Sequence, residues 1–189
     1  MLPTETTDTI IKTLKSDGVL LHPTDTIWGL AASAHSEIGI DKIYEIKKRE
    51  RNKPFLLLVD SLEMLKYYVP HIHPRIETLL LHHVQPLTII YPDVQNLPKY
   101  AVAENGSSGI RIVQSTSCQE MIKELGHPIV STSANLAGEP FPRSFEEISK
   151  EIIDQVDFID RFSNLSLLSG EPSVMITYNE KGDINFLRT

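Results

Sequence analysis

Short, mostly apolar runs separated by helical patterns are the feature that most constrains the fold of this chain. Within each run the residues are apolar almost without alternation, which is typical of strands buried on both faces of a sheet. The runs occupy residues 19–22, 55–59, 87–91, 109–113 and 128–131. Because helical patterns stand between most of them, the order predicts an α/β fold with helices on both faces of a sheet.

Helical patterns with recognisable end signals separate these runs. The expected helices cover residues 7–16, 36–49, 62–68, 74–83 and 118–125, and a capping box at Ser144–Glu147 starts another. Val174–Tyr178 and Ile184–Leu187 are β-rich and flank a turn at Asn179–Asp183, which predicts a hairpin. We therefore expect a single domain over residues 1–189, with a twisted sheet of mixed parallel and antiparallel strands flanked by helices.

Composition limits where such a chain works and what it binds. A length of 189 residues fits one hydrophobic core. The single cysteine, Cys118, excludes an internal disulfide framework and favours a reducing cytosol. No run approaches the roughly 18 apolar residues that span a bilayer, so we expect a cytoplasmic protein with no membrane partner. The net charge of −7 argues against extensive coating of nucleic acid.

One short segment departs from this acidic balance. Five cations fall within seven residues, at positions 47, 48, 49, 51 and 53, between an expected helix and an expected strand. A basic cluster at an element end is typical of anion binding. It is equally typical of a solvated helix terminus whose cations complement the helix dipole. The cluster alone leaves both interpretations open.

Two polar patches follow expected strands. Pro23–Thr26 comes after the first run and Ser131–Asn135 after the fifth, and Trp28 is placed to form an apolar wall beside the first patch. Hydroxyl and amide donors of this kind suit phosphate or carboxylate oxygens. Each patch also fits an ordinary turn whose side chains satisfy local backbone groups.

Several familiar site patterns are missing from the sequence. It contains no Walker A motif, no G-x-G-x-x-G motif and no G-x-S-x-G motif, which disfavours a P-loop enzyme, a Rossmann enzyme and a serine hydrolase. The His71, His73 pair and the adjacent His82 and His83 lack companion ligands at metal-binding spacing. We therefore predict no metal-ligating residues.

Short motifs stand in one order along nearly the whole chain. They are PTDTIWGL (23–30), KxR followed by KP (47–54), PLT (86–88), GIRI (109–112), STSAN (131–135) with Gly138, EPSVMI (171–176) and FLR (186–188). Each is weakly specific alone, but together their order and spacing resemble the YrdC-like family, the threonylcarbamoyl-AMP synthases. The resemblance implies a nucleotidyltransferase that forms threonylcarbamoyl-AMP and pyrophosphate from L-threonine, bicarbonate or CO₂, and ATP. This intermediate serves the threonylcarbamoyladenosine modification of tRNA.

The same resemblance implies roles for individual residues. The catalytic set it implies is Lys47, Arg49, Ser133 and Asn135. The implied ATP-binding set is Arg49, Lys53, Ser107, Asn135, Arg143 and Arg188. The implied L-threonine-binding set is Thr26, Arg111, Ser133 and Ser173, with Arg111 pairing with the carboxylate while the hydroxyls orient the amino group and side chain. Within the basic cluster, Lys48 and Arg51 are then expected to be solvated.

The implied reaction explains why no general base is recognisable. A carbamate oxygen that attacks the α-phosphate is already an anion, so the protein must mainly position it and offset repulsion with cations. We expect Mg²⁺ to be held mainly by ATP phosphates, with ATP as substrate. Alanine at Lys47 or Arg49 is expected to lower turnover about tenfold or more, with little effect on folding. The resemblance also implies downstream threonylcarbamoyl-transfer proteins and a weak tRNA contact as partners.

This chain departs from the family pattern at several positions. Trp28 stands where Tyr is common, Leu58 where some members have His, and His83–Gln85 where Gly-Pro is common. The chain ends soon after Arg188, as expected for the short, single-domain form. Two alternatives remain: a non-catalytic RNA-binding or ribosome-associated module of the same fold, and a related enzyme that handles carbamoyl-adenylate.

Overall fold

One mixed sheet runs through the computed structural model, which describes residues 4–51, 54–161, 163 and 169–189. In the described residues the strand order is β7-β1-β2-β6-β3-β5-β4-β8-β9. The strands are β1 (Leu20–Pro23), β2 (Trp28–Ser33), β3 (Leu56–Val59), β4 (Leu87–Tyr91), β5 (Ser108–Ile112), β6 (Ile129–Ser133), β7 (Phe158–Ile159), β8 (Val174–Tyr178) and β9 (Ile184–Arg188). The pairs β1 with β7, β3 with β5 and β4 with β8 are parallel and the other neighbouring pairs are antiparallel, so the predicted mixed sheet is confirmed.

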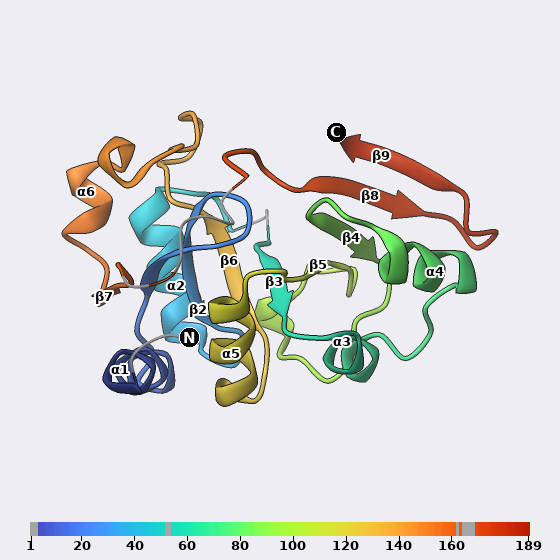
Figure 1. Cartoon of the computed structure of the whole chain (residues 1–189), viewed down its shortest axis with the longest axis horizontal. Coiled ribbons are helices and arrows are strands. Elements are labelled where there is room, and N and C mark those ends of the chain that lie inside the picture. Colours follow the sequence, from blue (N-terminus) through green and yellow to red (C-terminus); the bar gives the residue numbers. More distant parts are fainter. Residues whose placement is uncertain (1–3, 52–53, 162, 164–168) are drawn as a thin grey trace.

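Helices flank this sheet, as Figure 1 shows. They are α1 (Thr4–Lys15), α2 (Glu37–Lys47), α3 (Leu62–Tyr68), α4 (Pro74–His82), α5 (Thr116–Leu125) and α6 (Lys150–Ile153), with single 3-10 turns η1 (Lys99–Ala101) and η2 (Phe145–Glu147). Ser36 and Ser61 cap α2 and α3 by accepting hydrogen bonds from backbone N–H groups, and Gly126 ends α5 in the left-handed conformation. The α/β class predicted from the sequence is confirmed.

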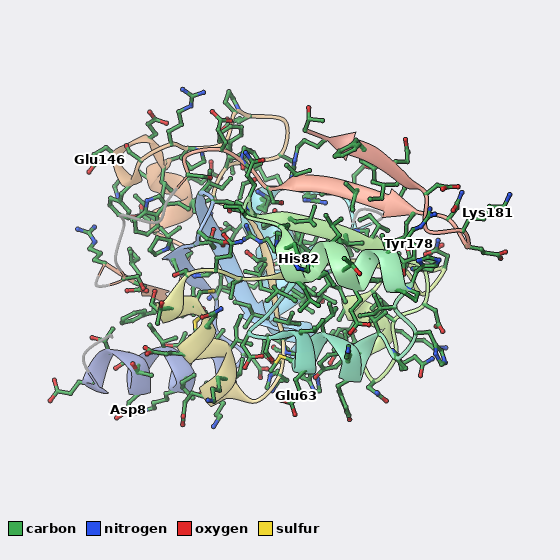
Figure 2. All side chains as sticks on the ribbon, turned by 45° about the vertical axis from the view of Figure 1, so that its right-hand side comes forward. Asp8, Glu63, His82, Glu146, Tyr178 and Lys181 are labelled. Atoms are coloured by element: carbon green, nitrogen blue, oxygen red, sulfur yellow. The ribbon has the colours of Figure 1, made fainter. Side chains whose placement is uncertain are left out.

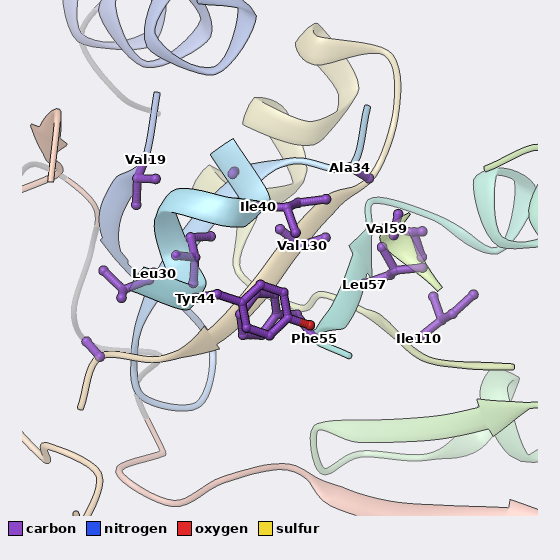
Figure 3. Close-up of a cluster of buried hydrophobic side chains, with 14 of the residues drawn as sticks. Val19, Leu30, Ala34, Ile40, Tyr44, Phe55, Leu57, Val59, Ile110 and Val130 are labelled. Atoms are coloured by element: carbon purple, nitrogen blue, oxygen red, sulfur yellow. The ribbon is translucent and has the colours of Figure 1, made fainter. Parts of the chain in front are cut away.

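The larger apolar cluster lies on the sheet face that α2, α3 and α4 cover. Figure 3 shows Ile40 and Tyr44 of α2 beside strand residues such as Leu57 and Val130, all of them buried. The rings of Tyr44 and Phe55 lie 4.2 Å apart, centroid to centroid. This packing joins the end of α2 to the start of β3, the two elements that flank the basic cluster.

A smaller cluster lies on the opposite sheet face, beneath α1 and α5. Side chains of these helices pack against Leu20, Ala31, Leu58 and Ile129 of the central strands. The two helices contact one another and cover only part of the face. Charged side chains such as Asp8, Glu63 and Lys181 stand on the outer surface, as Figure 2 shows.

Two elements differ from the sequence-based expectation. Residues Trp28–Ser33, for which we predicted no element, form the fully buried strand β2. The Ser144 capping box does not start an α-helix: the residues form η2, and the Ser144 side chain makes no capping hydrogen bond. The Glu147 carboxylate instead accepts a hydrogen bond from the backbone N–H of Arg143.

Candidate active site

A cavity of about 430 Å³ occupies the part of the sheet face that α1 and α5 leave open. The strand register explains its lining, because residues paired across neighbouring strands point to the same face. Gly29 pairs with Ser133, and Leu58 pairs with Arg111, so these four side-chain positions face one way. All four line the cavity, and β4, β8 and β9 contribute further lining residues. The cavity is thus a continuation of the smaller core.

Two glycines keep the floor of the cavity open. A Cβ atom at Gly109 would lie 2.7 Å from the Leu56 side chain and 3.1 Å from the Ile90 side chain. A Cβ atom at Gly29 would lie 3.1 Å from the Thr132 carbonyl oxygen. Larger residues at these positions would therefore both crowd the strands and fill the cavity.

Arg111 presents one free edge of its guanidinium group. Its Nη1 donates to the Thr26 Oγ1 at 2.9 Å and lies 3.3 Å from the Asp25 Oδ1. Asp25 is held in turn by the backbone N–H of Gln114, which donates to its Oδ2 at 3.2 Å. The Arg111 Nε is buried and has no hydrogen-bond partner among the described residues. The Nε and Nη2 atoms together form a planar fork that suits a carboxylate.

A second arginine lies on the opposite wall, at the end of β9. Arg188 donates from Nε to the Ser173 carbonyl oxygen at 2.9 Å and from Nη2 to the Ser173 Oγ at 3.2 Å. The same Ser173 hydroxyl shares a 2.7 Å hydrogen bond with the Oγ1 of Thr88, which is fully buried. Burial, followed by the positive charge of Arg111, lowers the pKa of Arg188. Two guanidinium groups this close together favour an anion between them.

The turn at the end of α2 places the third arginine of the cavity. Lys48 adopts the left-handed conformation (φ 50°), and the backbone N–H of Arg49 donates to the Tyr44 carbonyl oxygen at 3.0 Å. The Arg49 guanidinium then lies over the Phe55 ring at 5.0 Å and donates to the Pro54 carbonyl oxygen. Arg49 lines the cavity.

Lys48 and Arg51 of the basic cluster lie away from the cavity. Lys48 pairs with Glu151, and Arg51 pairs with Asp41, through side chains that are 63% and 60% exposed. Both therefore lie on the surface, as expected from their sequence positions. Lys53 falls outside the described residues.

Lys47 is buried rather than exposed, contrary to our expectation. Only 2% of the residue is exposed, and its Nζ donates to the carbonyl oxygens of Ser133 and Asn135 at 2.5 and 2.6 Å. Its own carbonyl oxygen accepts from the backbone N–H of Ala137. Burial, followed by the charge of Arg49, lowers the pKa of Lys47 to about 8. Lys47 therefore does not line the cavity but stabilises the end of β6 and the loop that follows it.

The structure gathers part of the residue set implied by the family resemblance. The members that line the cavity are Thr26, Arg49, Arg111, Ser133, Ser173 and Arg188. The members that do not line it are Lys47, Asn135, Ser107 and Arg143. The Asn135 amide donates to the Leu136 and Glu139 carbonyl oxygens, Ser107 bonds to Asn105 within its own turn, and Arg143 is an exposed partner of Glu171.

Three residues of this network were given no individual role by sequence reasoning, although two of them belong to the polar patch Pro23–Thr26. Thr24 and Asp25 belong to the same motif as Thr26, and Thr88 is the threonine of the PLT motif. Their membership of the PTDTIWGL and PLT motifs is the sequence signal that could have pointed to them. Their partners lie on distant strands, so residue spacing alone did not reveal the contacts.

The described residues place limits on metal and membrane binding. None of their His, Cys, Asp and Glu side chains gather in groups of three or more that could hold a metal ion. None of the helices they form is long and apolar enough to cross a bilayer. No carboxylate belongs to the described lining of the cavity, whereas three arginines do. The fold and this cavity therefore define an α/β protein with an open sheet face whose lining suits anionic ligands.

Comparison with known proteins identifies the family. The Sua5/YciO/YrdC family model, described as "Telomere recombination", matches residues 12–189, and the chain belongs to this family. The threonylcarbamoyl-AMP synthase of Klebsiella pneumoniae subsp. pneumoniae is 27% identical over 84% of this chain and 85% of its own length. The threonylcarbamoyl-AMP synthase of Xanthomonas euvesicatoria pv. vesicatoria is 30% identical over 79% and 82%.

Solved structures show the same fold. P. abyssi Sua5 complexed with L-threonine matches all of this chain with a TM-score of 0.87 and 22% identity. This chain spans 55% of that longer protein. E. coli YciO matches 98% of this chain and 89% of its own, with a TM-score of 0.82 and 20% identity.

Proposed function

We propose that this protein is an L-threonylcarbamoyladenylate synthase that converts L-threonine, bicarbonate or CO₂, and ATP into threonylcarbamoyl-AMP and pyrophosphate. The observation that carries the proposal is the cavity of Arg49, Arg111 and Arg188 with hydroxyl donors and no described carboxylate in its lining. Such a lining suits a substrate with several phosphates together with an amino acid. The names of the curated relatives support the same activity and give no support to a non-catalytic RNA-binding module.

L-Threonine fits the Arg111 side of the cavity. The free Nε and Nη2 edge of Arg111 binds the substrate carboxylate as a fork, and the hydroxyls of Thr26, Ser133 and Ser173 orient its amino group and side chain. Asp25, behind Arg111, keeps the guanidinium from turning away from the cavity. Because the carboxylate is anchored, the reacting nitrogen of the same molecule is held at a fixed place in the cavity.

ATP fits the remaining cations. Arg49 and Arg188 face the triphosphate from two sides, and Ser107, Asn135 and Arg143 add contacts from outside the cavity lining. Lys53 keeps the ATP-binding role that the family resemblance implies. Of the implied catalytic residues, Arg49 and Ser133 contact the substrates from the cavity lining, whereas Lys47 acts as a positioning residue that holds the backbone of Ser133 and Asn135. The described lining offers no carboxylate for a metal, so Mg²⁺ enters as part of the ATP complex, bound by phosphate oxygens and water.

The chemistry then proceeds in two steps. The threonine nitrogen attacks the carbon of CO₂ and releases a proton to water, which gives a carbamate. A carbamate oxygen attacks the α-phosphorus, the bond to the bridging oxygen breaks, and its electron pair leaves with pyrophosphate. The arginines offset repulsion between the two anions and stabilise the charge that develops on pyrophosphate.

The product is a reactive mixed anhydride, so it needs an acceptor reaction in the same compartment. We place the protein in the cytoplasm, where its single cysteine stays reduced, and we expect threonylcarbamoyl-transfer proteins that act on tRNA to consume the product. A weak tRNA contact would assist this transfer.

Pyrophosphate release tests the proposal. We expect release only when ATP, Mg²⁺, L-threonine and bicarbonate are all present, with one component omitted in turn as the control. Release that does not depend on L-threonine would contradict the proposal. Release with carbamoyl phosphate in place of bicarbonate would indicate an enzyme that handles carbamoyl-adenylate. Salt-sensitive tRNA binding without any release would indicate an RNA-binding module.

A further inference from the structure

Four hydrogen bonds converge on the hydroxyl groups of Thr24 and Thr26, in the turn between β1 and β2. The Thr24 Oγ1 donates to the Ile27 carbonyl oxygen at 2.9 Å and lies 2.8 Å from the Thr26 Oγ1. The backbone N–H of Thr26 donates to the Thr24 Oγ1 at 3.1 Å, and Arg111 donates to the Thr26 Oγ1 at 2.9 Å. Both threonines are 4% exposed, and both contact the cavity.

The number of available protons fixes the direction of these bonds. A hydroxyl group has one proton to donate and two lone pairs. The Ile27 carbonyl oxygen can only accept, so the bond to it uses the single proton of Thr24. The bond between the two hydroxyls is then donated by Thr26. In the reverse direction Thr24 would lose its bond to Ile27, and one of the four hydrogen bonds would be absent.

This direction decides what the Thr26 hydroxyl offers the cavity. Its proton is used by Thr24 and one lone pair by Arg111, so the remaining lone pair can only accept a hydrogen bond. An ammonium or amine N–H is a donor, and an ammonium group has no lone pair to accept with. The Thr26 hydroxyl is therefore matched to an amino group and mismatched to a carbonyl or phosphate oxygen.

We propose that Thr24 is a positioning residue for substrate selection, because it fixes the Thr26 hydroxyl as an acceptor for the amino group of the amino-acid substrate. This inference rests on the proposed function, which places L-threonine beside Arg111 and Thr26. Thr24 acts through Thr26 and not by its own contact with the substrate. Its loss therefore weakens recognition of the amino group and leaves recognition of the carboxylate by Arg111 intact.

Two ligands and a pair of near-isosteric variants test the proposal. Thr24→Val removes the hydroxyl and keeps the side-chain shape, whereas Thr24→Ser keeps the hydroxyl. The ligands are L-threonine and (R)-3-hydroxybutanoate, which is L-threonine without its amino group, titrated by NMR or calorimetry in the absence of ATP. We expect Thr24→Val to weaken L-threonine binding about tenfold and to leave hydroxybutanoate binding within about twofold, with Thr24→Ser close to wild type.

A double-mutant cycle separates an indirect role from a direct contact. Thr26→Val removes the acceptor itself, so adding Thr24→Val to it should weaken L-threonine binding no further. If Thr24→Val weakens both ligands equally, or weakens binding further in the Thr26→Val background, the proposal is overturned. Thr24→Ala provides the same comparison if thermal melting shows that Thr24→Val is unfolded. Wild-type protein that does not bind L-threonine would instead overturn the proposed function.

Discussion

Arg49 and Arg51 are chemically identical and two positions apart, yet only Arg49 reaches the cavity. Arg51 pairs with Asp41 on the surface. We expect Arg49→Ala to lower kcat/KM for pyrophosphate release about tenfold or more, which corresponds to about 1.4 kcal/mol of lost transition-state stabilisation. The control Arg51→Ala should stay near the wild-type rate. Equal losses in both variants would indicate that the overall charge of the cluster, and not the position of Arg49, supports the reaction.

Lys47 gives a second prediction at the scale of single residues. We expected its loss to have little effect on folding, and its burial corrects that expectation. Lys47→Met leaves two carbonyl oxygens without their donor, and we expect it to lower the free energy of unfolding by about 1–3 kcal/mol. Turnover should fall as well, because the loop of Ser133 and Asn135 loses its support. Urea denaturation measures the first effect, and the neighbouring surface variant Lys48→Met should change stability little. Unchanged stability of Lys47→Met would contradict the role we assign.

At the scale of secondary-structure elements, the sequence predicted what depends on local pattern. The apolar runs at 55–59 and 87–91 correspond to β3 and β4, and the expected C-terminal hairpin is confirmed as β8 and β9. Strand β2 was missed because Gly29, two alanines and Ser33 carry little strand propensity. These small residues are stabilised as a strand by pairing with β1 and β6.

In the site as well, the local sequence predicted the residues but not their distant partners. Ser133 was expected beyond the strand that ends at Ser131, but β6 continues to Ser133, and its alternation turns the hydroxyls of Ser131 and Ser133 toward the cavity. The ion pair of Arg111 with Asp25 joins β5 to the turn after β1, and it depends on the sheet order. Sequence motifs could name these residues, but they could not predict which of them lie next to one another.

The C-terminal end of α2 yields a prediction about an element boundary. Lys48 holds a left-handed conformation that glycine adopts without steric cost. We expect Lys48→Gly to raise the free energy of unfolding by about 0.5–1 kcal/mol relative to Lys48→Ala, measured by urea denaturation. Both variants lose the ion pair with Glu151, so their difference isolates the backbone effect. Equal stability of the two variants would show that the turn tolerates a Cβ atom at no cost.

At the scale of the whole molecule, the core and the site share one sheet face. The same register that points Ala31 and Leu58 toward α1 and α5 points Gly29 and Arg111 toward the cavity. Where α1 and α5 cover this face, its residues form an apolar core. Where the two helices leave it open, its residues line the cavity. The sheet therefore positions Arg111 and Arg188 directly, and the turn between α2 and β3 adds Arg49.

Two histidines, one buried and one half-buried, predict that the whole fold loses stability in acid. Burial lowers the pKa of His22 to about 4, and burial, His35 and Lys15 together lower the pKa of His127 to about 4. In the unfolded chain these groups take up protons near pH 6.5, so between pH 6.5 and about 4 the unfolded state binds more protons. The free energy of unfolding should therefore be highest above pH 6.5 and fall as the pH drops toward 4.

Urea denaturation across this pH range measures that slope. His127 is the better residue to substitute, because it does not line the cavity. Its Nε2 shares a hydrogen bond with the Ser33 Oγ at 2.7 Å. His127→Gln cannot take up the proton, so its stability should decline less steeply with falling pH, whatever its absolute stability. The exposed variant His82→Gln should follow the wild-type slope. A His127→Gln slope as steep as that of wild type would mean that His127 does not contribute to the loss of stability in acid.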